Sequence, residues 1–321
     1  MKCLVDMDTI QIEITNACIY SCSNCSRFCG HQKSFFMTFE QFRQGIDSME
    51  CFPGMIGIMG GEPLLHPLFR EFCEYARSKF PREQLGLWTT FPKGYESYRE
   101  IIHQTFGNIF LNDHSRPDIY HSPPLVAIEE VMPDPKKMFL LIDHCWLQNA
   151  WSASINPRGA FFCEVAASMS ILFDTDGSWP VESDWFTRTP KDYTSQIEEY
   201  CPKCGCCVEY EFDGKKYGLP RRSSMDGRDD ISLGNLKRLE GRSRKIQKGQ
   251  YVVSDLQCVE NPNQMAKYKE MDYRQGIASR YGMFLVLNDK GFCEPYLKGQ
   301  FDPERKSIFE QLREKYKEER S

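Results

Sequence analysis

The sequence predicts an α/β protein, a partial (β/α) barrel of about five to six parallel strands followed by a small cysteine-rich domain. Between residues 10 and 131, short apolar runs alternate with helical patterns of about a dozen residues, which is typical of βα units and a parallel sheet. The stretch holds about five such strands, whereas a closed barrel needs about eight. The chain also has 15 cysteines among its 321 residues, and many of them lie close together.

The strands are predicted from short runs rich in apolar residues. The first is 10–15 (IQIEIT), and the second, 55–59 (MIGIM), ends in a tight turn at Gly60-Gly61. The later strands are expected at 85–90, 108–112 and 124–131.

The helices are predicted from apolar residues at helical spacing. In residues 39–50 these are Phe42, Ile46 and Met49, and Thr38 with Gln41 resembles a capping box at the start. The same spacing predicts helices over 67–79 and 95–105, and Pro303 suits the first position of a helix at 303–319.

The βα pattern breaks near residue 132. Residues 151–164 are expected to form a β-hairpin that turns at 156–159, and residues 283–296 a second one that turns at 288–291. Residues 201–207 (CPKCGCC) are a cysteine knuckle. We therefore expect three units, 8–132, 133–210 and a C-terminal extension, 211–321.

Composition narrows the class of protein. Hydrophobic residues make up 41%, which excludes global disorder. The net charge of −5 argues against a protein whose whole surface binds nucleic acid, and a local basic patch is left open. The N-terminus shows no signal peptide, and no run is apolar enough to span a membrane. A cytoplasmic protein is expected, in which thiols stay reduced, so clustered cysteines indicate metal.

Residues 219–250 are expected to be charged and loop-like, with nine basic and four acidic residues. Such a stretch is a solvated face or, alternatively, a site for a substrate phosphate.

The first cysteine cluster follows the first strand. Cys18, Cys22 and Cys25 have CxxxCxxC spacing, and three thiolates on one loop hold three irons of a 4Fe-4S cluster while the fourth iron stays open. Structural zinc, with Cys29 as a fourth ligand, is the alternative.

This loop and the Gly60-Gly61-Glu62-Pro63 segment resemble the radical S-adenosylmethionine (SAM) superfamily. The resemblance implies that the cluster binds SAM, that residues 60–63 contact its amino group, and that an electron donor such as flavodoxin or ferredoxin is needed. Asn24 stands where the family usually has an aromatic residue at the adenine, which Tyr20 or Phe28 would replace. Thr89-Thr90-Phe91 stands where the family has a TNG-like turn.

The second cysteine group resembles the auxiliary-cluster domains of that superfamily, called SPASM or twitch. The resemblance implies one auxiliary 4Fe-4S cluster held by Cys145, Cys163, Cys201 and Cys204, with Cys206 or Cys207 as a possible replacement for Cys204. Two clusters or a zinc knuckle are the alternatives. Four thiolates would make the cluster an electron relay.

The layout is similar to the small twitch enzymes of aminoglycoside pathways, which implies hydrogen abstraction from a carbon of a sugar, cyclitol or nucleotide-linked sugar. The outcome is dehydrogenation or epimerisation, and the latter needs a thiol donor from Cys29, Cys206, Cys207, Cys258 or Cys293. Radical modification of a ribosomal peptide and a non-catalytic iron–sulfur electron carrier are alternatives. No catalytic residue is assigned, although His144, Arg158 and Glu164 lie in a suitable segment for a general base.

Overall fold

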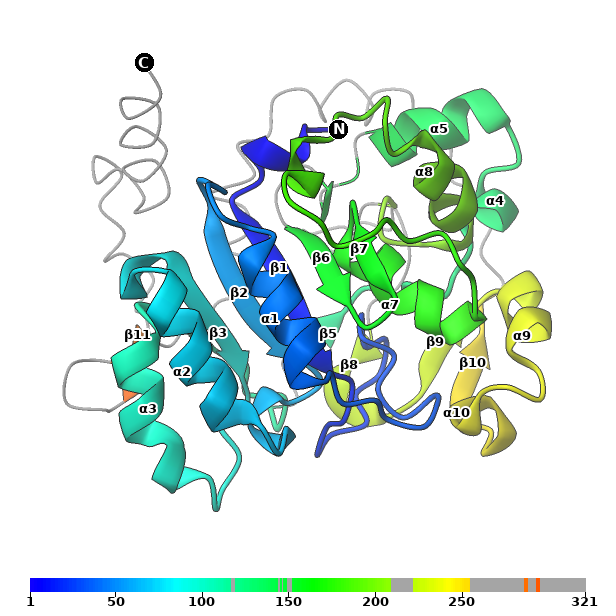
Figure 1. Ribbon diagram of the computed structural model, residues 1–321. Coiled ribbons are helices and arrows are strands. Elements are labelled where there is room, and N and C mark those ends of the chain that lie inside the picture. The colour runs from blue at the N-terminus through cyan, green and yellow to red at the C-terminus, as the bar shows by residue number, and fades with distance from the viewer. Residues whose placement is uncertain are drawn as a thin grey trace.

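The computed structural model describes residues 1–116, 119–143, 145, 147–148, 152–208, 222–254, 286–287 and 293–294. Its centre is a six-stranded sheet with the strand order β4-β3-β2-β1-β6-β7 (Figure 1). The strands from β4 to β6 are parallel to their neighbours, and β7 runs antiparallel at the edge. The predicted α/β class is confirmed, and an open sheet of five parallel strands is consistent with a partial barrel.

The strands of this sheet are β1 (Thr9–Thr15), β2 (Met55–Gly60), β3 (Leu85–Thr89), β4 (Asn108–Leu111), β6 (Ser152–Asn156) and β7 (Gly159–Phe161). The helices are α1 (Phe39–Asp47), α2 (Phe69–Lys79), α3 (Arg99–Thr105), α4 (Ile128–Val131), α5 (Pro135–Asp143), α7 (Glu164–Phe173), α8 (Thr194–Tyr200), α9 (Leu233–Leu239) and α10 (Arg244–Gln247). Three further strand pairs are β5 (Tyr120–His121) with β8 (Arg222–Ser223), β9 (Asp229–Ile231) with β10 (Tyr251–Val253), and β11 (Val286–Leu287) with β12 (Cys293–Glu294).

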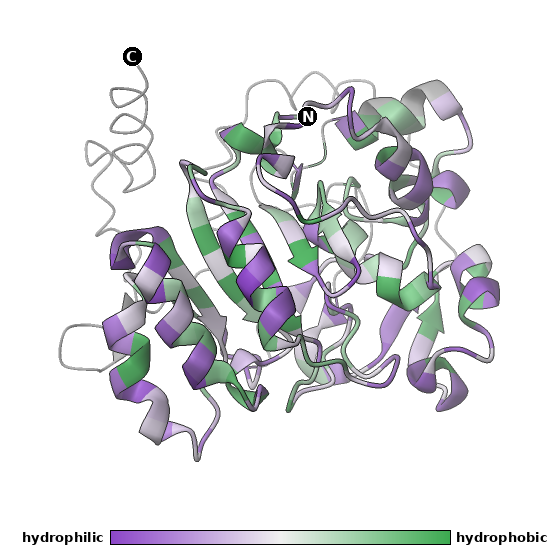
Figure 2. Ribbon diagram, in the orientation of Figure 1, coloured by the Kyte–Doolittle hydropathy of each residue, from purple (hydrophilic) through white to green (hydrophobic). Residues whose placement is uncertain are grey.

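Helices α1, α2 and α3 cover one face of the sheet (Figure 1). Figure 2 shows that their outer surfaces are hydrophilic, whereas the strands behind them are largely hydrophobic. Phe42 of α1 stacks on Phe72 of α2 with ring centroids 4.1 Å apart, and both are fully buried. The expected capping box is confirmed, since the Thr38 hydroxyl accepts from the Gln41 N–H and the Gln41 side chain accepts from the Thr38 N–H. This apolar layer holds the first strands in register.

Two predictions of local structure are wrong. Residues 124–131 are not a strand: they run through an isolated bridge at Leu125 into helix α4. A continuous apolar run marks burial without specifying the secondary structure, and here it is buried against α5 and the knuckle. The segment expected to be loop-like is ordered over 222–254, where it forms β8, β9, α9, α10 and β10.

Both hairpins are confirmed in their pairing. Asn156 pairs with Gly159 at the turn between β6 and β7, and Val286 pairs with Glu294 in the later one. Strand β6 also pairs in parallel with β1, so the first hairpin extends the main sheet. The 288–291 turn and the helix expected at 303–319 lie outside the described residues. Among the helices that are described, none has both the length and the apolar character to cross a membrane.

Candidate functional site

A cavity of about 220 Å³ lies where the first four strands end. In parallel sheets the carboxyl ends of the strands share one edge, and the loops that follow them converge there. The cavity is lined by residues that follow β1, β2, β3 and β4 and by parts of later segments, among them Cys18, Tyr20, Cys22, Asn24, Cys25, Arg27, Cys29, Gly60, Gly61, Trp88, Thr90, Asp113, His114, His121, Glu164 and Cys206.

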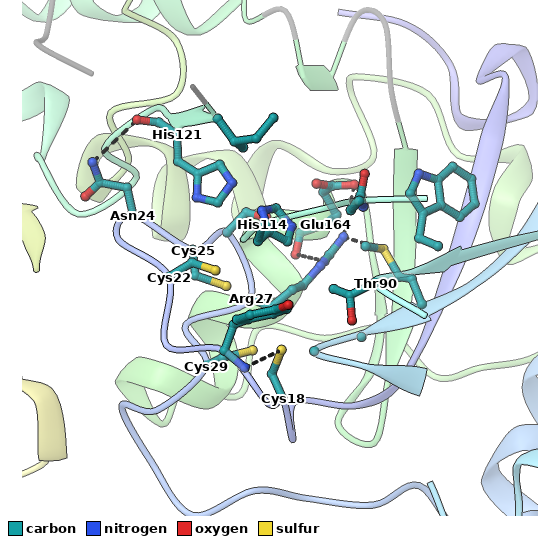
Figure 3. A pocket seen from close by; sticks show the side chains of 18 of the residues that line it. Cys18, Cys22, Asn24, Cys25, Arg27, Cys29, Thr90, His114, His121 and Glu164 are labelled. Carbon is teal, nitrogen blue, oxygen red and sulfur yellow. Dashed lines mark hydrogen bonds and ion pairs between the residues drawn. The ribbon is translucent and has the colours of Figure 1, made fainter. Parts of the chain in front are cut away.

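The first cysteine cluster lies on this cavity. Cys18, Cys22 and Cys25 all line it, and Cys29 joins them as a fourth lining thiol (Figure 3). Cys29 is 2% exposed, and its thiol lies beside the thiols of Cys18 and Cys25, whose proximity together with burial raises its pKa well above the ordinary value. Burial raises the pKa of the Cys22 thiol well above its ordinary value, and the charges of Cys25 and Cys18 raise it further. A metal that binds here must therefore displace protons.

The donor set of this cluster fits an iron–sulfur group. Within the described residues, no group of three or more His, Cys, Asp or Glu side chains is arranged to hold a metal ion. A 4Fe-4S cluster fills the space between its thiolates, so it requires sulfur ligands around a cavity rather than around a point. Four thiols with an adjoining cavity meet that requirement, and soft thiolate ligands select iron–sulfur clusters or zinc.

The four residues of the GGEP segment have different positions. Gly60 and Gly61 line the cavity, and the segment is bound to the end of β1 and the residues after it, because the Gly61 N–H donates to the Thr15 carbonyl and the Glu62 N–H to the Ala17 carbonyl. Pro63 begins a short 3₁₀ helix, Pro63–Leu65, that Glu62 caps. Segment 60–63 is therefore fastened to the cysteine loop.

The Glu62 carboxylate is buried, and Glu62 is not among the residues that line the cavity. One oxygen accepts from the Leu64 N–H and the Thr89 hydroxyl at 3.0 and 2.7 Å. The other accepts from the N–H and the hydroxyl of Thr90 at 2.7 and 2.6 Å. The Thr89-Thr90-Phe91 turn is thus held by Glu62, and both threonines line the cavity.

Buried charges form another part of the lining. Arg27 lies 3.1 Å from the Glu164 carboxylate, and both side chains are at most 6% exposed. Arg27 also donates to the Gln11 side chain and to the Glu164 carbonyl. Burial raises the pKa of nearby Glu13 to about 7, although the Arg27 charge opposes this. Glu164, a candidate base, therefore reaches the cavity as part of an ion pair.

Two histidines of the cavity were missed by sequence reasoning. His114 follows β4, and His121 lies in β5 with its ring 5.0 Å from that of His114. Burial lowers the pKa of His114 to about 4, with a further contribution from His121, so its ring is neutral near pH 7. His121 Nδ1 lies 2.7 Å from the Ser23 carbonyl, which fixes that nitrogen as the donor. For His114, its place three residues beyond the end of β4 was the available signal.

Residues 222–254 bind the loop that carries Cys18, Cys22 and Cys25, which we call the cysteine loop, and we call these contacts the clasp. Lys245, 1% exposed, donates to the Cys22 carbonyl at 2.8 Å and forms an ion pair with Asp229 at 3.0 Å. Asp229 also lies 2.8 Å from His31. Burial would raise the pKa of Asp229, but the hydrogen bond with His31 and the Lys245 charge hold it below its ordinary value. The carboxylate is therefore ionised near neutral pH.

Asn24 joins this clasp. Its backbone N–H donates to Asp229, its side chain donates to Asp230 at 2.9 Å, and the Asp230 N–H donates back to its amide oxygen at 2.8 Å. Tyr20 lines the cavity with its ring edge-on to His114, whereas Phe28 packs on His31. Of the two candidates for an adenine contact, Tyr20 thus has access to the cavity lining.

The second cysteine group surrounds a smaller cavity of about 30 Å³, lined by Cys145, Cys163, Cys201, Cys204, Cys206 and Cys207. The structure brings the four predicted ligands together with both alternatives. Burial raises the pKa of Cys145 to about 12, and the Cys204 charge adds to this shift. Cys206 lines both cavities, so the two cavities adjoin at this residue.

Other candidates lie elsewhere. Arg158 pairs with Asp174 and Asp176 at the surface, and His144 and Cys258 lie outside the described residues. Some basic residues of the 222–254 segment form ion pairs with acidic residues: Arg222 pairs with Asp226 and Asp230, and Arg238 with Glu129. Together with Arg228 and Lys245, which pair with Asp226 and Asp229, these pairs account for four of the nine basic residues that were considered for a substrate phosphate.

No protein-family model matches the chain, and no curated protein matches it. Two crystal structures of BtrN are similar to it. One, in complex with AdoMet and 2-DOIA, has 14% identity and a TM-score of 0.42 over 66% of this chain and 98% of the other. The second, SeMet BtrN in an open conformation, has 14% identity and a TM-score of 0.42 over 64% of this chain and 92% of the other. This similarity is too distant to assign a family.

Proposed function

We propose that the chain is a radical SAM enzyme that abstracts hydrogen from a carbon of a sugar, cyclitol or nucleotide-linked sugar. One observation supports this most strongly: Cys18, Cys22 and Cys25 share a cavity with Gly60 and Gly61 at the carboxyl ends of β1 and β2. The bound cluster and SAM would supply a 5′-deoxyadenosyl radical through one-electron reduction. The first three cysteines would hold the cluster, and Tyr20, Thr89 and Thr90 would border the nucleoside.

The lining supports a hydroxyl-rich substrate. Asn112, Asp113, His121, Ser122 and Glu164 bring donors and acceptors to a wall that also contains Trp88 and Leu111. Polyhydroxylated rings present many hydroxyls and small apolar faces, which such a mixed wall complements. Neutral His114 would accept a proton from a substrate hydroxyl in the dehydrogenase version.

Dehydrogenation and epimerisation require different groups beside the substrate radical. An auxiliary cluster held by Cys145, Cys163, Cys201 and Cys204 would take an electron from the substrate radical and leave a ketone. Epimerisation instead needs a thiol hydrogen, and Cys29 and Cys206 are the thiols on the first cavity outside the three-cysteine motif. Cys206 is our candidate because Cys29 contacts the motif thiols themselves.

A non-catalytic iron–sulfur electron carrier is the second candidate. It is favoured by Cys29, which would complete four thiolate ligands on the first cluster. A carrier would leave the cavity beside the cluster without a role. Peptide modification has no comparable feature in its favour among the described residues.

The test is reductive SAM cleavage by anaerobically reconstituted protein. We expect 5′-deoxyadenosine and methionine from the wild type, and about eight irons per chain in two clusters. The Cys18→Ala, Cys22→Ala, Cys25→Ala triple variant should retain about four irons and form no deoxyadenosine. A wild type that binds iron without cleaving SAM would identify the carrier, and zinc alone would exclude both candidates.

The role of Cys206 is tested by turnover of candidate sugars in deuterated water. An epimerase should place one non-exchangeable deuterium in the product, and Cys206→Ala should abolish it while Cys207→Ala retains it. A ketone product without solvent deuterium at the reacting carbon identifies the dehydrogenase and removes the donor role from Cys206.

A further inference from the structure

The fourth thiol of the cysteine loop has no place in a site with three ligands. The sequence continues CxxxCxxC with Cys29, four residues beyond Cys25. Its side chain is buried against Cys18 and Cys25 and lines the same cavity as they do (Figure 3). Four sulfur ligands are thus gathered where three would suffice.

The chain on both sides of Cys29 is firmly anchored. Arg27 is 4% exposed and paired with Glu164, and His31 is 1% exposed and held between Ser243 and Asp229 at 2.8 Å from each. Phe28 adopts a φ of +51°, the left-handed region that non-glycine residues seldom occupy. This turn is closed by the Phe28 N–H, which donates to the Cys25 carbonyl. The turn directs Cys29 back toward the first three thiols, so the backbone conformation of the loop fixes the position of Cys29.

We propose that Cys29 is an exchangeable fourth ligand of the first cluster, bound to the open iron until SAM displaces it. This inference rests on the proposed function and adds a resting state to it. On exchange the Cys29 thiolate would leave the iron and take a proton from solvent, and SAM would bind in its place. No electron is transferred. Cys29 therefore protects the exposed iron in the absence of SAM and lowers the apparent affinity for SAM.

The cavity explains why this ligand is exchangeable. A cluster held permanently by four thiolates needs no open space at its side, yet about 220 Å³ lies beside these thiols, bordered by Gly60, Gly61 and Thr90. A thiolate that occupies the iron in nine molecules of ten would weaken apparent SAM binding about tenfold, because only the remaining tenth is competent. Removing that thiolate should therefore make apparent SAM binding about tenfold tighter.

The experiment compares wild type, Cys29→Ala and a matched control, Cys51→Ala, which removes an exposed cysteine. Each anaerobically reconstituted protein is treated with mild ferricyanide without SAM, and electron paramagnetic resonance is recorded. Loss of a single unprotected iron leaves a three-iron cluster with its own signal. We expect little of that signal from wild type and Cys51→Ala, and at least a tenfold stronger signal from Cys29→Ala. Equilibrium SAM binding should be about tenfold tighter in Cys29→Ala.

Equal three-iron signals and equal SAM affinities in all three proteins would overturn the proposal. If Cys29→Ala yields no soluble protein, Cys29→Ser retains the side-chain volume with a weaker iron ligand, and the same changes are expected. Because the signal is recorded without turnover, the proposed function is judged separately. Wild type that shows no three-iron signal and cleaves no SAM would support four-thiolate ligation while ending the enzymatic proposal.

Discussion

At the scale of single residues, ionisable side chains are buried in and around the wall of the cavity. Glu13 of β1 is 1% exposed, receives a hydrogen bond from Ser168, and lies near the Arg27–Glu164 pair. Burial raises its pKa to about 7, so its carboxyl is largely protonated in mildly acidic solution. Unfolding returns this carboxyl to water and to an ordinary pKa near 4.5. Folding stability is therefore linked to pH through this group.

The sign of the linkage follows from the raised pKa. The protonated form is favoured in the folded protein, so Glu13 imposes no penalty below about pH 4.5 and a growing penalty as pH rises toward 7. A difference of about 2.5 pH units corresponds to roughly 3 kcal/mol. We expect Glu13→Gln to gain stability relative to wild type by up to about 3 kcal/mol between pH 5 and 8, as measured by urea unfolding. Glu50→Gln, at an exposed position, is the control, and a flat difference for Glu13→Gln across this range would contradict the prediction.

At the scale of elements, the close packing of β2 against the end of β1 explains why residues 60 and 61 are glycines. A Cβ atom on Gly60 would lie 2.0 Å from the Thr15 carbonyl oxygen, and one on Gly61 would lie 2.3 Å from that of Ala17. Both obstacles are backbone atoms, which cannot rotate away. The glycines therefore allow the end of β2 to pack on the cysteine loop, in addition to any approach of a ligand.

Gly60→Ala should consequently force β1 and β2 apart at the cavity. We expect a loss of about 3 kcal/mol in urea unfolding and reduced iron binding by Cys18, Cys22 and Cys25. Gly45→Ala in α1 is the matched control, because its Cβ would meet Ile12 at an ordinary 3.5 Å. That control should be neutral or gain up to about 1 kcal/mol from helix propensity. Equal stabilities of the two variants would refute this account of Gly60.

Across the whole molecule, the cysteine loop near the N-terminus depends on residues more than 200 positions later. Lys245 binds the Cys22 carbonyl, and Asp229 binds the Asn24 N–H, so one buried ion pair holds both sides of the loop. A buried pair that loses one partner leaves an uncompensated charge. The later segment is thus a structural part of the first cysteine cluster.

Lys245→Met retains most of the side-chain length and removes the charge. We expect a loss of about 3–5 kcal/mol in unfolding free energy and a lower iron content of the first cluster. Adding Asp229→Asn to this variant should recover part of the loss, since the unpaired carboxylate disappears. Arg228→Met, which breaks an exposed pair with Asp226, should change stability by less than about 1 kcal/mol. If Lys245→Met were as stable as Arg228→Met, the clasp would have no energetic role.

The sequence by itself determined the α/β class, the order of the first strands and helices, and the capping box at Thr38, because these depend on local periodicity and hydrogen bonds between near neighbours. It also identified the cysteine motif and the glycine pair that line the cavity. Spacing within one loop is a local property, which explains why Cys18, Cys22 and Cys25 were recognisable. The helix at 128–131 was missed, since an apolar run reports burial and not conformation.

Only the tertiary structure decided which distant residues meet. His121 enters the cavity, Glu62 binds Thr89 and Thr90, and Lys245 binds the Cys22 carbonyl, and none of these contacts can be read from local spacing. The same holds for Cys206, which lies on both cavities. Charged residues of 222–254 resemble a solvated segment in sequence because local patterns do not reveal the partner of an ion pair. That partner is set by the packing of strands and loops far apart along the chain.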